Sequence, residues 1–238
     1  MNQEKASEIG EKEMRGALAL PAETVLLFAR YPEPGRVKTR LAADIGTKAA
    51  AVLQCLFVEE AIKRLSAGGF HVTLCYTPAA RGPDFREWLP GLDLLAQTGE
   101  DLGARMKNAF QEVFSRGIRA AVCLGSDAPD LPLEHVALAF SWLKGDGSVL
   151  GPAGDGGYYL IGFTGKSFAP EAFSGVAWGG PEVLSRTLSN LRSRGLAPEL
   201  LPVWRDVDSL GDLADLKRRQ DERPVLSPTL RAMLEEIL

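Results

Sequence analysis

The stretch TVLLFARYPEPGRVKTRLA, Thr24–Ala42, sets the expected architecture of this chain. It begins with a continuous apolar run over 24–29, which is typical of a strand buried on both faces. Turn residues end the run, and Pro34-Gly35 suits the middle of a type II turn because glycine readily adopts a positive φ. The sequence therefore predicts a buried strand followed by a loop that folds back over the strand's carboxyl end.

Strand-like and helical segments alternate along the chain. Further strands are expected at 71–77, 92–97, 120–125, 148–153, 157–163 and 200–209. Helices are expected at 47–65, 85–89, 101–115, 182–194, 213–219 and 228–238, and another is expected to start at Leu133. Because parallel strands need crossover connections, the alternation predicts an α/β fold with a parallel sheet covered by helices. We expect residues 24–238 to form one domain and residues 1–23 to be a flexible or accessory N-terminus.

Composition limits the classes of function. The chain has 238 residues, 45% of them hydrophobic, and a net charge of -4, so we expect a globular protein without a broad surface for nucleic acid. Its apolar runs are too short for a signal peptide or a membrane span. Cys55, Cys75 and Cys123 lie far apart, which favours free thiols in a reducing cytoplasm over a zinc site.

Three bases, Arg36, Lys38 and Arg40, alternate in the loop that follows the first strand. Ligands of open α/β sheets bind at the carboxyl ends of the strands, and arginine and lysine both suit phosphate oxygens. We therefore expect a phosphate-binding loop, with a solvated basic stretch as the alternative. The loop matches neither the Walker pattern nor the glycine pattern of dinucleotide-binding folds.

Asp127 follows the strand at 120–125 and should lie at the same edge of the sheet as the basic loop. A carboxylate placed there can hold Mg²⁺ between the protein and a nucleotide. The alternative for Asp127 is a turn or cap residue, and we expect Asp130 to cap the next helix.

Two later motifs carry further acids. Asp206 and Asp208 would share one face if the strand at 200–209 persists, although Asp208 could instead cap the following helix. Asp155 lies in a glycine-rich loop that permits close approach of a ligand, and Tyr158 and Tyr159 could border a sugar or a base. The structural alternative is a tight connection in which Asp155 bonds its own backbone.

The segment GEDLGARM, 99–106, has two interpretations. In the structural one, Asp101 caps a helix and Arg105 is solvated. In the functional one, Asp101 and Arg105 lie near the nucleotide, because a helix N-terminus favours phosphate. Trp178 likewise fits either the core or the border of an acceptor pocket.

Five motifs in order, PEPGRVKTRLA, GEDLGARM, GSDAPDLP, GPAGDGGYYLIGF and DVDSLGDL, resemble the bacterial DUF2064 family of glycosyltransferase-like proteins. The resemblance runs from about Val25 to Leu213. It implies a GT-A, Rossmann-like three-layer α/β/α fold with a mixed, mainly parallel sheet. It also implies relationship to the nucleotide-diphospho-sugar transferases, including guanylyltransferases.

The resemblance assigns roles to particular residues. Arg36, Lys38 and Arg40 look like the bases that face the phosphates. Asp127 and Asp208 look like the metal-coordinating acids, although the usual D-x-D spacing and the G-x-G-x-R loop of nucleotidyltransferases are both absent.

The expected function is nucleotidyl or glycosyl transfer, dependent on Mg²⁺ or Mn²⁺, from a nucleoside triphosphate or a nucleotide sugar to an unknown acceptor. Positioning and charge neutralisation would do most of the catalysis, with Lys38, Asp127 and Asp155 as the catalytic residues. In glycosyl transfer, Asp155 would act as the general base toward an acceptor hydroxyl. The alternative is a catalytically silent scaffold that binds a nucleotide or a partner.

Overall fold

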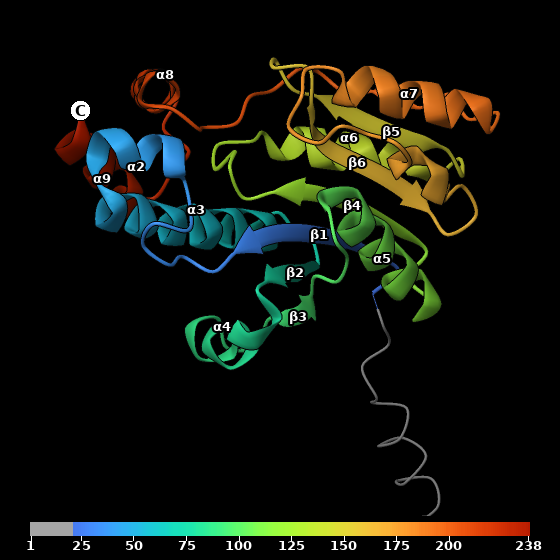
Figure 1. Cartoon of the computed structure of the whole chain (residues 1–238), viewed down its shortest axis with the longest axis horizontal. Coiled ribbons are helices and arrows are strands. Elements are labelled where there is room, and N and C mark those ends of the chain that lie inside the picture. The colour runs from blue at the N-terminus through green and yellow to red at the C-terminus, as the bar shows by residue number, and fades with distance from the viewer. Residues whose placement is uncertain (1–20) are drawn as a thin grey trace, which may run out of the picture.

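Strand β1 (Glu23–Arg30) lies in the interior of a mixed sheet that organises the whole fold (Figure 1). The computed structural model describes residues 21–238. Most of the predicted accessory N-terminus, residues 1–20, therefore lies outside the described residues, and Glu23 already belongs to β1. The predicted strand at 24–29 is confirmed, and its interior residues are buried on both faces.

Seven strands of the described chain form one sheet in the order β3-β2-β1-β4-β6-β5-β7. The remaining strands are β2 (Val72–Thr77), β3 (Asp93–Ala96), β4 (Ala120–Gly125), β5 (Ser148–Pro152), β6 (Tyr158–Thr164) and β7 (Glu199–Leu200). Strand β6 runs antiparallel to β4 and β5, whereas the other neighbouring pairs are parallel. The prediction of a mixed, mainly parallel sheet is confirmed.

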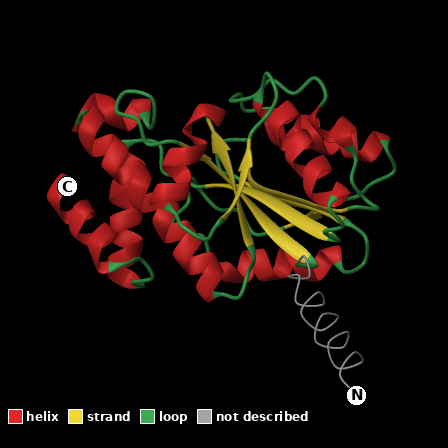
Figure 2. Ribbon diagram, turned by 90° about the horizontal axis from the view of Figure 1, so that it is seen from below, coloured by secondary structure: helices red, strands yellow, loops and turns green. Residues whose placement is uncertain are grey.

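Helices cover both faces of the sheet, which gives three layers (Figure 2). The α-helices are α2 (Thr39–Ile45), α3 (Thr47–Ala67), α4 (Gly82–Trp88), α5 (Leu102–Ser115), α6 (Leu133–Leu143), α7 (Val183–Ser193), α8 (Leu210–Glu222) and α9 (Pro228–Ile237). Short 3₁₀ turns occur at Ala79–Arg81 and Pro170–Phe173. Among residues 21–238, no helix combines the length and the apolar run needed to cross a bilayer.

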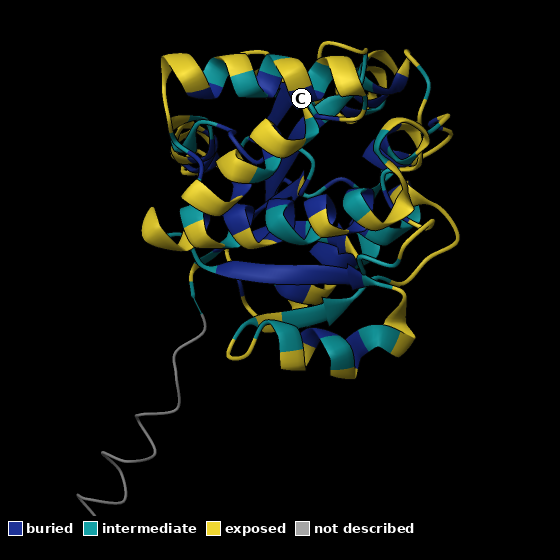
Figure 3. Cartoon of the chain, turned by 90° about the vertical axis from the view of Figure 1, so that its left-hand side faces the viewer, coloured by how far each residue is buried: buried dark blue, intermediate teal, exposed yellow. Residues whose placement is uncertain are grey.

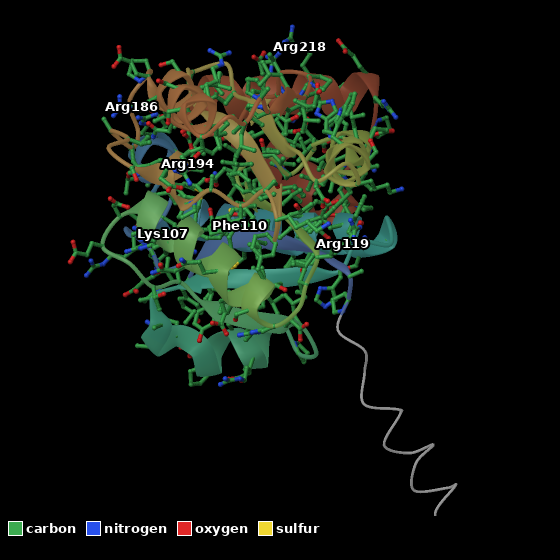
Figure 4. All side chains as sticks on the ribbon, turned by 90° about the vertical axis from the view of Figure 1, so that its right-hand side faces the viewer. Lys107, Phe110, Arg119, Arg186, Arg194 and Arg218 are labelled. Atoms are coloured by element: carbon green, nitrogen blue, oxygen red, sulfur yellow. The ribbon has the colours of Figure 1, made fainter. Side chains whose placement is uncertain are left out.

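The sheet has a separate apolar core on each face, because successive side chains of a strand point to opposite sides. Leu27 of β1 belongs to the core cluster that includes residues of α3, α4 and α6, whereas its neighbour Leu26 belongs to the cluster that includes residues of α5 and α7. Figure 3 shows a dark, buried strand of the sheet beneath the helices, and Figure 4 labels Phe110 of α5; both Leu27 and Phe110 are fully buried.

Helix α3 is buried on two sides. Its second side packs against α2, α8 and α9, which lie around it at the left of Figure 1. Phe57 of α3 and Val207, which follows the sheet, both belong to this third cluster. The cluster brings the segment 201–209 close to the carboxyl ends of the central strands.

Two parts of the predicted secondary structure differ from the fold. The strand expected at 200–209 is wrong, because regular pairing stops at Leu200 and continues only as an isolated bridge between Ala153 and Trp204. Pro152 of β5 has no N–H to donate to the Leu201 carbonyl, so the parallel ladder cannot continue. Helix α2 was not predicted, since its seven residues begin without a side-chain cap.

Candidate functional site

Two adjoining cavities lie at the carboxyl ends of the central strands. The first has a volume of about 530 Å³ and the second of about 400 Å³. They share Phe28, Leu102, Asp127 and Asp208 as lining residues. This edge of the sheet is where ligands of open α/β folds bind.

The loop after β1 folds as its sequence predicts and then turns sharply. Gly35 has φ 79°, and the Arg36 N–H donates to the Glu33 carbonyl over 2.9 Å, as in a type II turn. Lys38 then adopts a left-handed conformation with φ 44° directly before α2. Such a conformation costs a non-glycine residue about 1–3 kcal/mol and is typical of functional sites.

The Lys38 side chain points into the protein and is only 2% exposed. Its ammonium forms a short ion pair with Asp127 Oδ1 and donates to the Val207 carbonyl over 2.8 Å. It also lies 4.7 Å from the centre of the Phe57 ring. One lysine therefore connects the basic loop, the end of β4, the segment 201–209 and α3.

The other two bases lie apart from each other. Arg36 is exposed at the first cavity, and its carbonyl accepts a hydrogen bond of 3.2 Å from Arg30. Arg40 belongs to α2, is 80% exposed, and approaches Asp208 at 3.9 Å. The structure thus places Arg36 and Lys38 at the first cavity and Arg40 outside it.

Four carboxylates, Asp127, Asp155, Asp206 and Asp208, line the second cavity, and no lysine or arginine of residues 21–238 does so. Burial raises the pKa of Asp206 to about 7, with a further contribution from Asp127 and Asp208. Burial and Asp127 also raise the pKa of Asp208. The carboxylates therefore repel one another, and a cation would relieve that repulsion.

Asp206 and Asp208 reach this cluster without the predicted strand. The hydrogen bonds of a capping box explain why the Asp208 carboxylate is available: Ser209 is the N-cap of α8, and its side chain exchanges bonds with Asp212. The alternative role of Asp208 as the helix cap is therefore wrong.

Asp130, predicted to cap α6, does not do so. The N-cap of that helix is Pro132, and the Asp130 side chain is 3% exposed and accepts a 2.7 Å bond from Arg219. The Asp130 carboxylate therefore pairs with Arg219 of α8 and not with the backbone N–H groups at the start of α6.

The glycine-rich loop between β5 and β6 has a clear structural role. Asp155 accepts a 2.9 Å bond from the Gly157 N–H, as the structural interpretation predicted. Gly156 has φ 91°, and a Cβ there would lie 2.1 Å from the Pro181 carbonyl oxygen. Asp155 is exposed and also lines the second cavity, so the backbone bond leaves its place in the site open.

Aromatic side chains form part of the second cavity. Tyr158 and Trp178 meet edge to face with ring centroids 6.4 Å apart, and Trp178 packs over Gly103 of α5. Trp178 therefore contributes to both the core and the cavity wall. Tyr159 is 4% exposed, and its hydroxyl is engaged with His135 and Pro202, which makes it chiefly a core residue.

The motif 99–106 begins α5 with the helix cap that its sequence predicts. Asp101 caps α5 by accepting a 2.7 Å bond from the Ala104 N–H, and Arg105 donates to the Gly99 carbonyl over 3.1 Å. Asp101 and Arg105 both line the first cavity.

Several lining residues of the first cavity were not predicted. Arg30, Thr77, Gln97 and Ser126 lie at or just beyond the ends of β1 to β4, so the position of polar residues after apolar runs could have identified them. Gln54 gave no such signal, because it is a buried residue inside α3 that donates to Ser126 over 3.0 Å.

Two carboxylates fit a divalent cation here. Among residues 21–238, no group of three or more His, Cys, Asp and Glu side chains is arranged to hold a metal on its own. Mg²⁺ is commonly held by one or two carboxylates together with substrate phosphates, and the adjacent Asp127 and Asp208, with mutual repulsion, suit that mode. The cysteines are not involved: within the described chain all three are free thiols, and Cys75 and Cys123 are buried as expected.

Comparisons with known proteins agree with this architecture. A structure from Desulfovibrio desulfuricans G20, described as a "putative nucleotide-diphospho-sugar transferase", is 40% identical, covers 91% of this chain and 95% of its own, and has a TM-score of 0.87. A cytidylyltransferase from Leptospira borgpetersenii serovar Hardjo-bovis (strain JB197) is 15% identical over 91% of this chain and 94% of its own, with a TM-score of 0.54.

A CMP:2-keto-3-deoxy-manno-octonic acid synthetase complexed with CTP is 13% identical over 84% of this chain and 98% of its own, with a TM-score of 0.52. These two distant structures share the fold. No protein with a curated description matches the sequence. Residues 44–180, more than half of the chain, match the family described as "Uncharacterized protein conserved in bacteria (DUF2064)", and the chain therefore belongs to the DUF2064 family.

Proposed function

We propose that this protein is a transferase that acts on a nucleoside triphosphate or a nucleotide sugar and requires Mg²⁺ or Mn²⁺. The observation that carries the proposal is the placement of the bases: Arg30, Arg36, Lys38 and Arg105 line the first cavity beside Glu100 and Asp101, and no lysine or arginine of the described chain lines the second. Asp127 and Asp208 line both cavities, so a diphosphate could pair with the bases while a divalent cation pairs with the carboxylates. The 40% identical structure described as a putative nucleotide-diphospho-sugar transferase supports the same general chemistry.

The nucleotide would occupy the first cavity. Arg36, exposed there, would bind phosphate oxygens, and Lys38 would gain a phosphate as a second anionic partner beside Asp127. Asp127 and Asp208 would hold the divalent cation, which, when bound, supplies Lewis-acid stabilisation of the charge on the leaving group. The remaining work of the protein is to place the reacting groups and to keep them in position.

The acceptor would occupy the second cavity, between the carboxylates and Trp178. For a hydroxyl acceptor, a carboxylate must receive the proton, and Asp155 and Asp206 are the two lining acids not assigned to the cation. Asp155 was the predicted base and remains a prediction. Asp206 is the candidate that the structure adds, since it is half-buried in the same wall.

The reaction can be identified by its leaving group. The purified protein is incubated with each nucleoside triphosphate and with several nucleotide sugars, with Mg²⁺, with Mn²⁺ or with EDTA. Release of pyrophosphate indicates nucleotidyl transfer, and release of a nucleoside diphosphate indicates glycosyl transfer or hydrolysis. The proposal fails if no nucleotide binds or reacts under any of these conditions.

One observation favours the alternative of a nucleotide-binding protein without turnover. The Lys38 ammonium already forms an ion pair with Asp127, one of the two acids assigned to the cation. A nucleotide that raises the melting temperature equally in Mg²⁺ and in EDTA, without product, would support this binding role and contradict the transferase proposal.

A further inference from the structure

A third cavity lies away from the candidate site, where α3, α6 and α8 meet the segment around Trp204. It has a volume of about 520 Å³. Arg64, Asp130, Trp204 and Arg219 are among its lining residues. The lining residues of the third cavity are absent from the two cavities of the candidate site, although Trp204 also borders a further cavity lined by Asp155, Asp206 and Asp208.

Four buried polar atoms around this cavity have no hydrogen-bond partner among the described residues. They are Asp130 Oδ1, Trp204 Nε1 and both terminal nitrogens, Nη1 and Nη2, of Arg219. The Asp130 side chain is 3% exposed and that of Arg219 is 18% exposed. An unpartnered buried polar group costs about 1–3 kcal/mol, so these atoms call for an occupant that bonds to them.

The missing partner must chiefly accept hydrogen bonds. Arg219 and Trp204 leave donors unmet, whereas Asp130 leaves one acceptor unmet. Arg219 Nε is already paired with Asp130 Oδ2 at 2.7 Å. The two outer nitrogens of the guanidinium remain as a buried, unpaired fork, whose geometry matches the paired oxygens of a phosphate or a carboxylate.

A second arginine adds positive charge. Arg64 of α3 donates to the Pro129 carbonyl, and burial lowers its pKa while Asp130, Glu60 and Glu134 act against that shift. Glu60 accepts from the Ser227 N–H over 3.1 Å, and the two glutamates that line the cavity, Glu134 and Glu222, are exposed.

The walls also offer an aromatic surface. The Arg219 guanidinium carbon lies 5.7 Å from the centre of the Trp204 ring, so the positive charge of Arg219 is adjacent to the indole of Trp204. The volume is large enough for a small metabolite with one anionic group and a planar or apolar remainder.

We propose that this third cavity is a second binding site, for a small molecule that bears an oxyanion, either a phosphate or a carboxylate. Arg219 and Arg64 bind the oxyanion, and the Trp204 Nε1–H donates to the ligand. The proposal does not rest on the transfer reaction, because none of the residues that would bind the oxyanion lines the two transfer cavities.

The test follows the indole N–H signals of the full-length chain by ¹H–¹⁵N NMR. The sequence has four tryptophans, and Trp204→Phe identifies the signal of Trp204. Inorganic phosphate and acetate are titrated separately, at constant ionic strength, into the Lys38→Met variant, so that phosphate binding at the basic loop is weakened. We expect a saturable shift of the Trp204 signal by phosphate, by acetate or by both, and the two titrations distinguish the anion classes.

Variants show whether the arginines bind the anion. Arg219→Lys keeps the charge but loses the fork, and is expected to weaken binding about tenfold, the equivalent of one lost charge-assisted bond. Arg219→Lys also alters the partner of the buried Asp130. Arg64→Lys therefore provides a second test of whether an arginine binds the anion, and it leaves the Asp130–Arg219 pair in place. Arg218→Lys is the matched control: Arg218 is 66% exposed on the same helix, at the top of the molecule in Figure 4.

The proposal is overturned if neither anion shifts the Trp204 signal in a saturable way. It is also overturned if Arg64→Lys and Arg219→Lys, folded as judged by their spectra, bind as tightly as the Arg218→Lys control. Loss of transferase activity would leave both results unaffected, so the two proposals fail independently.

Discussion

Replacing Asp127 by asparagine is expected to destabilise the metal-free protein far more than replacing its partner Lys38 by methionine. The reason is the unequal burial of the pair: the Lys38 side chain is 2% exposed and that of Asp127 is 42% exposed. Asp127→Asn removes the one carboxylate paired with this ammonium among the described residues, so the buried charge is left with neutral oxygen partners, the amide oxygen and the Val207 carbonyl. An uncompensated buried charge costs about 3–5 kcal/mol.

Lys38→Met removes the buried charge itself. The remaining Asp127 carboxylate can be hydrated, so the expected loss is about 1 kcal/mol or less. In the double variant the asparagine has no buried ammonium beside it, and its stability should match that of Lys38→Met within about 1 kcal/mol. For a chain of this size, a loss of 3 kcal/mol corresponds to a fall in Tm of about 6–12 °C.

The assay is urea unfolding in EDTA, followed by circular dichroism, for the wild type, both single variants and the double variant. Equal losses for the two single variants, or no recovery in the double variant, would refute the reasoning from burial. The expected result has a practical consequence. Because Asp127→Asn is expected to lose stability, its inactivity identifies Asp127 as a metal ligand only if the variant is shown to be folded under the assay conditions.

Three further predictions concern other parts of the site. The pKa of Asp206 is raised from 3.8 to about 7, so the fold favours its protonated form, and wild-type stability falls as pH rises through that range. In EDTA, Asp206→Asn should therefore be more stable than the wild type above pH 7, by up to about 4 kcal/mol, with no gain below pH 4; a gain that is independent of pH would contradict this. Gly156→Ala should lower the free energy of unfolding by at least about 2 kcal/mol, because of φ 91° and the contact with Pro181, whereas Gly154→Ala, which has open space, should be nearly neutral in the same urea titration. Arg36→Ala should weaken nucleotide binding several-fold at low salt and much less at high salt by calorimetry, and an equal loss at both would argue against a phosphate contact.

The fold was largely predictable because strong local signals coincide with the tertiary structure. The buried run of β1, the type II turn at Gly35 and the cap at Asp101 each follow from a few neighbouring residues. The alternation of strands and helices then leads to the mainly parallel sheet. The antiparallel strand β6 follows from pairing across the sheet, which no local signal indicates.

The site was predictable in position but not in detail. Alternate spacing suggested that Arg36, Lys38 and Arg40 act together, but the left-handed Lys38 and the start of α2 direct them to different places. The inward position of Lys38 depends on Asp127, 89 residues further along the chain. Asp130 shows the same effect: its choice of Arg219 over the helix end depends on packing between distant segments.

The arrangement of cation and nucleotide can be observed directly in crystals grown with a nucleoside triphosphate and Mn²⁺, by locating the anomalous signal of manganese. We expect the Mn²⁺ peak between the carboxylates of Asp127 and Asp208, with the phosphates extending into the first cavity toward Arg36. A nucleotide bound on another face, or manganese held away from both carboxylates, would contradict the proposed transfer site.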